Sequence, residues 1–198
     1  VFETGDPRRD ETLLYFSTPS KPWPSIAPAT GNAPFGEFLI SQDGLDGDFY
    51  NKKAYCSPKL RDYYGSNSGK WYNIRMIRYS DVVLMAAEAA CELGSEAMIE
   101  EALDYLEQVR KRARGTNTNV LPKVPTTNQS ELRDAIHHER HVELALEFGR
   151  FYDLVRWNEA TTVLGNKGYT DKNKYLPLPQ TQVDASNGVL IQNPDYVN

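Results

Sequence analysis

The sequence has no apolar run that approaches the roughly 20 residues a helix needs to cross a membrane, and no secretion signal is recognisable at its start. Val1 stands in place of an initiator methionine, which favours a processed or excised piece. Basic residues are a minority, with 22 Lys and Arg against 27 Asp and Glu and a net charge of −5. No basic stripe stands out, which argues against nucleic acid as a ligand.

Cysteine is also scarce, since only Cys56 and Cys91 are present in 198 residues. Cys91 falls in a helical apolar pattern and is predicted to be a small buried side chain, whereas Cys56 lies among aromatic residues. A disulfide between them is compatible with the count but does not follow from it. Neither thiol has the neighbourhood of a catalytic cysteine.

Proline, glycine and aromatic residues are concentrated before Asn73. Residues 1–73 hold 7 of the 12 prolines, 7 of the 13 glycines and 13 of the 22 aromatic residues. Such a high density of proline and glycine predicts loops and short strands. We therefore expect a loop-rich aromatic segment over residues 1–73, a candidate ligand surface, followed by a helical region over residues 74–198. The two are expected to form one structural unit.

The helical region opens with a pattern typical of a helix hairpin. Ser80 or Asp81 is predicted to cap a first helix that ends at Gly94, and Ser95 to cap a second. The apolar positions of the first helix are Val82, Val83, Ala86, Ala89, Ala90 and Leu93, and those of the second are Met98, Ala102, Leu106, Val109 and Ala113. The small residues predict close packing of the two helices.

A third helix, with Ser130 as its expected cap, carries carboxylates among its apolar residues. Glu139, Glu143 and Glu147 are spaced four residues apart, close to the arc formed by Leu132, Ala135, Ile136, Val142 and Leu146. Buried carboxylates need cations. The candidates are Arg140 within the helix, Arg150 and Arg156 on a second helix expected from Phe151 to about Leu164, and the row Arg110, Arg112 and Arg114. This pattern predicts a structural ion-pair core, because a general acid would need an open cleft and a raised pKa.

This stretch also carries a family resemblance. The sequence ERHVELALEFGRFYDLVRW resembles the ER-x-x-EL-x-x-EG-x-R-x-x-DL-x-RW signature of the SusD/RagB family. The matching positions are Glu139, Arg140, Glu143, Leu144, Glu147, Arg150, Asp153, Leu154, Arg156 and Trp157. MIRYSDVVLMAAEAACELG before it, YLPLPQTQVDASNGVLIQNPDY after it and the Asp6-Pro7-Arg8 turn fit the same family. One departure is Phe148, which stands where the family has glycine.

The resemblance implies a mainly helical fold with tetratricopeptide-like hairpins packed against a loop-rich, partly irregular segment. It implies the C-terminal portion of a lipoprotein that binds glycans at the outer membrane of Bacteroidetes and delivers them to a SusC-like TonB-dependent transporter, with no catalysis and no cofactor. The lipid anchor would lie outside this chain. The alternatives are a helical-repeat scaffold that binds a protein partner, for which a single hairpin is few repeats, and a glycoside hydrolase with paired carboxylates.

Glycan contacts are expected from the aromatic segment. Sugars present apolar faces and a polar rim, so their sites combine flat aromatic rings with hydrogen-bonding groups. The candidates are Trp23, Trp71, Tyr72 and Tyr50, of which Trp23 is favoured because the prolines and polar residues around it disfavour burial.

Two metal patterns are incomplete. His137 and His141 share a helix face but lack a third ligand and the order of a zinc-protease motif. Asp43, Asp46 and Asp48 lack the spacing of a calcium loop. We therefore expect no metal site.

Overall fold

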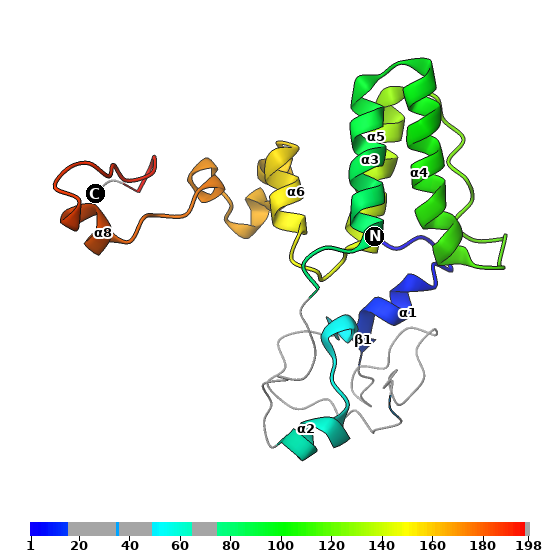
Figure 1. The fold of residues 1–198 in the computed structure, drawn as a ribbon, viewed down its shortest axis with the longest axis horizontal. Helices are drawn as coiled ribbons and strands as arrows, with labels where there is room; N and C mark the ends of the chain where they lie inside the picture. Colours follow the sequence, from blue (N-terminus) through cyan, green and yellow to red (C-terminus); the bar gives the residue numbers. More distant parts are fainter. Residues whose placement is uncertain (16–34, 36–48, 65–74, 197–198) are drawn as a thin grey trace. The chain divides into compact units, whose positions relative to one another are not determined.

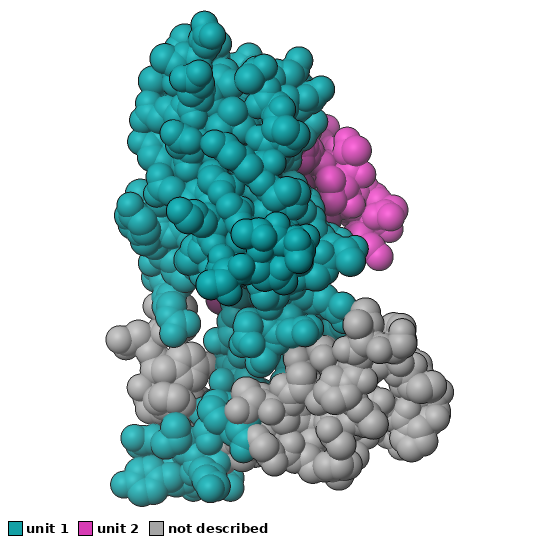
Figure 2. Space-filling model, turned by 90° about the vertical axis from the view of Figure 1, so that its right-hand side faces the viewer, with its two compact units in different colours: residues 1–147 teal, residues 148–198 magenta. Residues whose placement is uncertain are grey.

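The computed structural model describes residues 1–15, 35, 49–64 and 75–196, and it forms two compact units, residues 1–147 and 148–198 (Figure 2). Most of the described chain is helical, with one short two-stranded sheet. The predicted mainly helical fold is therefore confirmed. The boundary predicted near Asn73 lies outside the described residues. None of the described helices combines the length and apolarity needed to cross a bilayer.

Three helices form the body of the first unit and stand side by side in Figure 1: α3 (Tyr79–Leu93), α4 (Glu96–Arg114) and α5 (Gln129–Glu143). Gly94 ends α3 in the left-handed conformation, with φ of 73°, and the Ser95 side chain caps α4 by accepting from the Met98 amide. Both features agree with the sequence analysis. The predicted caps of the other two helices were wrong: α3 begins after Arg78 without a side-chain cap, and Asn128 caps α5 by accepting from the amides of Ser130 and Glu131.

The core of this body lies where the three helices meet. Its buried apolar residues are Val83, Leu84, Ala87, Ala90 and Cys91 of α3, Ile99, Ala102, Leu106 and Val109 of α4, and Leu132 and Ile136 of α5. The face predicted for α3 was partly wrong, because Val82 and Leu93 are exposed and Leu84, Ala87 and Cys91 take their place in the core. Cys91 is the small buried side chain that was expected, and no disulfide joins it to Cys56.

The start of the chain adds α1 (Arg8–Thr12) and strand β1 (Leu13–Tyr15), which pairs antiparallel with β2 (Phe49–Asn51) through Leu14 opposite Tyr50. A 3₁₀ turn, η1 (Lys52–Ala54), and helix α2 (Pro58–Tyr64) follow. The pairing brings two stretches of the aromatic segment together.

Helix α5 is shorter than predicted, because it ends at Glu143. Leu146 and Phe148 adopt positive φ values of 63° and 69°, which an α-helix does not allow. Glu147 therefore lies in the turn that follows α5. Leu146, predicted on the buried arc, is 45% exposed.

The second unit consists of short helical pieces: α6 (Arg150–Arg156), α7 (Ala160–Leu164), the 3₁₀ turns η2 (Gly165–Lys167) and η3 (Asp171–Lys174), and α8 (Gln180–Ala185). The single helix predicted from Phe151 to Leu164 was wrong. Asn158 between α6 and α7 has φ of 59°, and this left-handed residue interrupts the helical backbone.

Candidate functional site

The carboxylate cluster, formed by Glu139, Glu143 and Glu147, is the most densely paired group of charges among the described residues of the first unit. The Glu139 side chain is fully buried. It accepts from the guanidinium of Arg8 and from Arg110 Nη1 at 3.0 Å. Arg8 comes from the start of the chain and Arg110 from α4, so this one carboxylate joins three elements.

Glu143 lies at the centre of the cluster, with a side chain that is 2% exposed. Its Oε2 is 3.2 Å from Arg8 Nη1 and 2.6 Å from Arg112 Nη2, and its Oε1 is 3.0 Å from Arg78 Nη1. Burial alone would raise the pKa of Glu143, but the charges of Arg112, Arg78 and Arg8 outweigh it, so the pKa is lowered. This carboxylate is held in its ionised form.

Glu147 completes the cluster from the turn after α5. Arg78 Nε donates to its Oε2 at 2.6 Å, and Lys53 Nζ donates to its Oε1 at 2.5 Å. Lys53 also donates to the carbonyl oxygens of Glu143 and Ala145. Burial raises the pKa of Glu147, but hydrogen bonds from Arg78 and Lys53 lower it further than burial raises it. The turn is thus fixed by side chains that come from η1 and from the residue before α3.

Only some of the arginines that the sequence suggested as partners of the carboxylate cluster pair with it in the structure. Arg110 and Arg112 pair with the cluster as considered, whereas Arg114 pairs with Glu107. Arg140 pairs with Asp81 of α3 at 2.9 Å. In the second unit, Arg156 Nε pairs with Asp153 at 2.9 Å, and the guanidiniums of Arg150 and Arg156 lie 5.7 Å and 4.7 Å from the centroid of the Trp157 ring. Sequence reasoning did not predict that Arg8 and Arg78 pair with Glu143. Arg8 was noted only as part of the Asp6-Pro7-Arg8 turn, and no local sequence pattern connects either arginine with Glu143.

The two ends of the 9–77 segment are held at one carboxylate. Arg8 immediately precedes this segment, Arg78 immediately follows it, and both guanidiniums contact Glu143. Within the segment, Lys53 contacts Glu147, and Asn51 Nδ2 donates to the Leu146 carbonyl at 2.9 Å. The carboxylate cluster therefore anchors both ends of the 9–77 segment to the helical body.

All four candidate glycan residues fall within the 9–77 segment. Tyr50 is half-buried on β2, and Trp23, Trp71 and Tyr72 lie outside the described residues. Other aromatic rings of the segment are accessible: Tyr63 is 81% exposed and packs edge-on against Tyr64 of α2, with ring centroids 5.1 Å apart. Binding loops are commonly positioned in this way, with exposed side chains on a segment that a helical scaffold holds in place.

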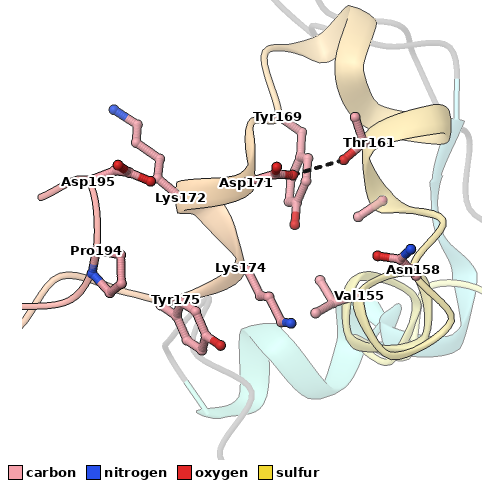
Figure 3. Close-up of a pocket in the computed structure, with 11 residues that line it drawn as sticks. Val155, Asn158, Thr161, Tyr169, Asp171, Lys172, Lys174, Tyr175, Pro194 and Asp195 are labelled. Carbon is pink, nitrogen blue, oxygen red and sulfur yellow. Dashed lines mark hydrogen bonds between the residues drawn. The ribbon is translucent and has the colours of Figure 1, made fainter.

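The second unit contains a hollow of about 380 Å³ (Figure 3). Figure 3 shows Lys174 extending toward Val155, and a hydrogen bond of 3.3 Å from the Thr161 hydroxyl to Asp171. The lining residues are Val155, Asn158, Ala160, Thr161, Tyr169, Asp171, Lys172, Lys174, Tyr175, Pro194 and Asp195. Two lysines and two aspartates balance in charge, which suits a neutral, hydrogen-bonding occupant such as water or a small polyol. None of these residues was predicted from the sequence as a site residue.

In the part of the chain that the structure describes, no three His, Cys, Asp or Glu side chains converge as a metal ion would need. His137 and His141 are half-buried on α5. Asp43, Asp46 and Asp48 lie outside the described residues.

Comparison with known proteins gives consistent matches. A model of the SusD family matches residues 2–172. SusD-like protein P2 of Formosa agariphila is 31% identical over 163 residues, which cover 74% of this chain and 32% of that protein. Surface glycan-binding protein A from Bacteroides thetaiotaomicron superposes with a TM-score of 0.65 at 26% identity, covering 98% of this chain and 39% of that one. A SusD homologue from the same species gives 0.63 at 20% identity, covering 98% and 41%, and this likeness is one of fold. The chain thus spans about a third of the length of the curated relative.

Proposed function

This chain belongs to the SusD family, and we propose that it is part of a protein that binds oligosaccharide or polysaccharide at the bacterial cell surface without cleaving it. In this role the glycan passes to a SusC-like TonB-dependent transporter in the outer membrane. A lipid anchor outside this chain attaches the protein to the surface.

The observation that carries the proposal is the similarity to surface glycan-binding protein A, which extends over 98% of this chain. The two proteins are 26% identical, so they are similar in sequence as well as in fold. This similarity to a surface glycan-binding protein over nearly the whole chain supports a role in glycan binding.

The chemistry of the 9–77 segment supports the same role. Trp23, Trp71, Tyr72 and Tyr50 supply rings on which the apolar face of a sugar can stack, and asparagines in the same segment supply hydrogen bonds. Contacts of this kind are individually weak. A protein that must release its glycan to a transporter needs that weakness.

The state of the carboxylate cluster argues against a glycoside hydrolase at this position. A glycosidase needs one carboxyl group with a raised pKa that faces the scissile bond in an open cleft. Here the side chains of Glu139 and Glu143 are buried, each contacts two or more arginines, and the pKa of Glu143 is lowered. The cluster is therefore suited to support.

The test is electrophoresis of the intact protein through native gels that contain single polysaccharides, both neutral and acidic. We expect retardation by at least one polysaccharide, and no reducing sugar released after prolonged incubation. Trp23→Ala should abolish the retardation and leave the melting temperature nearly unchanged. Trp157→Ala, a matched change outside the 9–77 segment, should keep the retardation.

Three outcomes would count against the proposal. Unchanged retardation of Trp23→Ala removes Trp23 from the site. Mobility that no polysaccharide alters overturns glycan binding, and release of reducing sugar overturns the non-catalytic assignment.

A further inference from the structure

Asn187-Gly188 is the only Asn-Gly pair in the sequence. The backbone nitrogen of the residue that follows an asparagine can attack the carbonyl carbon of its side chain and close a small ring. Glycine favours this attack because it has no side chain that shields the nitrogen or restricts the backbone. The pair therefore places an electrophile and an unhindered nucleophile in neighbouring residues.

The structure places this pair in an exposed turn that follows α8. Asn187 and Gly188 have positive φ values of 52° and 87°, and both residues are exposed. Ser186 closes the turn, because its carbonyl accepts from the Val189 amide at 3.2 Å and its hydroxyl accepts from the Leu190 amide at 2.9 Å. Neither bond uses the Asn187 side chain or the Gly188 amide.

Both reacting groups are accessible. Among the described residues, none accepts a hydrogen bond from the Gly188 amide, and none bonds to the side-chain amide of Asn187. The space beside Gly188 is open, since a Cβ added there would meet nothing within 4 Å. The nitrogen still has to approach the side-chain carbonyl carbon, and an exposed turn opens locally at little cost in free energy.

Asn158 provides a contrast within the same unit. It is exposed and has nearly the same backbone conformation, with φ of 59°, but Glu159 follows it. The Glu159 amide donates to the Leu154 carbonyl at 2.8 Å, so the nitrogen that would attack is held in place. Asn187 thus differs from Asn158 in the residue that follows it and not in its own exposure or conformation.

We propose that Asn187 is a site of spontaneous deamidation, a modification that needs only water. The Gly188 nitrogen loses its proton to solvent and bonds to Asn187 Cγ, the Cγ–Nδ2 bond breaks, and the released nitrogen takes up a proton and leaves as ammonia. Water then opens the ring at one of its two carbonyl carbons. Breaking the bond from the Gly188 nitrogen to Cγ leaves aspartate, and breaking its bond to the main-chain carbonyl carbon leaves isoaspartate. In total one water is consumed and one ammonia is released.

Either product changes this part of the surface. The new carboxylate adds one negative charge to a chain of net charge −5, and isoaspartate also lengthens the main chain by one methylene within the turn. The tail beyond the turn is held separately, because the Gln192 side chain accepts from the Leu178 amide at 2.7 Å and donates to the Leu178 carbonyl at 2.8 Å. We therefore expect conversion to alter the charge of the protein without unfolding the second unit.

Peptide mass spectrometry of the intact protein, aged in neutral buffer at physiological temperature, tests the proposal. Trypsin cleaves after Lys174, and the next peptide carries Asn187. We expect Asn187 to gain the mass of one amide-to-acid conversion about tenfold or more faster than Asn158, because glycine leaves the attacking nitrogen free. The aged protein should also become a substrate for an isoaspartyl methyltransferase. The rate should rise in mildly alkaline buffer, since the attack requires loss of the Gly188 amide proton.

Two glycine variants separate the chemistry from backbone strain. Gly188→Ala should slow the conversion of Asn187 about tenfold, because a methyl group restricts the backbone at the attacking nitrogen. Gly168→Ala is the matched control, since Gly168 also has a positive φ, 90°, and open surroundings, but it does not follow an asparagine. It should leave the conversion rate unchanged, and circular dichroism should show that both variants are folded.

Each result decides. Conversion that is fast at Asn187, yields isoaspartate and slows in Gly188→Ala but not in Gly168→Ala supports the proposal. A rate at Asn187 no faster than at Asn158 in the folded protein overturns it, and fast conversion in urea would then show that the turn protects the pair. Conversion that yields aspartate alone, or that Gly188→Ala leaves unchanged, also overturns it, because direct hydrolysis of the amide uses neither the ring nor the Gly188 nitrogen.

Discussion

Replacing Glu143 with glutamine should destabilise the first unit far more than the same change at an exposed ion pair. Glutamine keeps the shape of the side chain but removes the negative charge that faces Arg8, Arg78 and Arg112. Removing one member of a buried ion pair typically costs about 3–5 kcal/mol, since its partners stay buried without compensation. The side chain of Glu143 is 2% exposed, so it belongs to that class.

The surrounding contacts place the expected cost at the lower end of this range. Arg112 is 59% exposed, and its share is small because solvent screens it. Arg8 keeps Asp6 and Glu139 as partners, and Arg78 keeps Glu147. We expect a loss of about 3 kcal/mol, which in a chain of this size lowers the melting temperature by about 6–12 °C.

Urea denaturation followed by circular dichroism measures this loss, with Glu92→Gln as the matched control. The Glu92 side chain is 48% exposed and pairs with Arg133, so its replacement should cost about 0.2–1 kcal/mol. If Glu143→Gln loses no more free energy of unfolding than Glu92→Gln, the carboxylate cluster does not stabilise the fold.

Three further predictions concern acid, a helix cap and a helix end. The pKa of Glu143 is lowered from 4.5, so the ionised carboxylate stabilises the fold fully above about pH 5, and this contribution is lost as pH falls through the folded-state pKa. Between about pH 7 and about pH 3 the urea midpoint should therefore fall less in Glu143→Gln than in the wild type. Equal falls in the two proteins would contradict this. Asn128→Ala should cost about 1 kcal/mol in urea denaturation, whereas Ser130→Ala should stay within about 0.5 kcal/mol; the reverse order would return the cap to Ser130. Gly94→Ala should cost about 1–2 kcal/mol in the same assay, because alanine is strained at φ of 73° and its Cβ would lie 2.9 Å from Gln129 Nε2; an unchanged midpoint would show that the turn relaxes.

Local signals in the sequence predicted the hairpin well. Gly94 and Ser95 end one helix and begin the next because the conformation of each depends on its immediate neighbours. The burial of Glu139 and Glu143 also followed from the helical periodicity. These features need no knowledge of distant parts of the chain.

The ion pairs between residues far apart in the chain could not be predicted from the sequence. Arg8 and Arg78 reach Glu143 across 135 and 65 positions, and no periodicity encodes such a distance. The packing face of α3 was only partly predicted, for a different reason. Both sides of this helix are apolar, so the pattern alone does not tell which side meets α4 and α5. Composition predicted a loop-rich aromatic segment, and the resemblance to the SusD/RagB family made it the candidate glycan surface, but neither predicts how its rings are arranged.

The shared anchorage of Arg8 and Arg78 on Glu143 makes the chain between them exchangeable. The ends of this stretch are closed by the scaffold, so the entropy of closing a flexible loop grows only with the logarithm of its length, about 0.6 kcal/mol for each doubling. Lengthening the stretch between the anchors therefore costs much less than the loss of one anchoring charge. One unchanged helical frame can in this way carry recognition surfaces of different length and composition, as the framework of an antibody domain carries its variable loops.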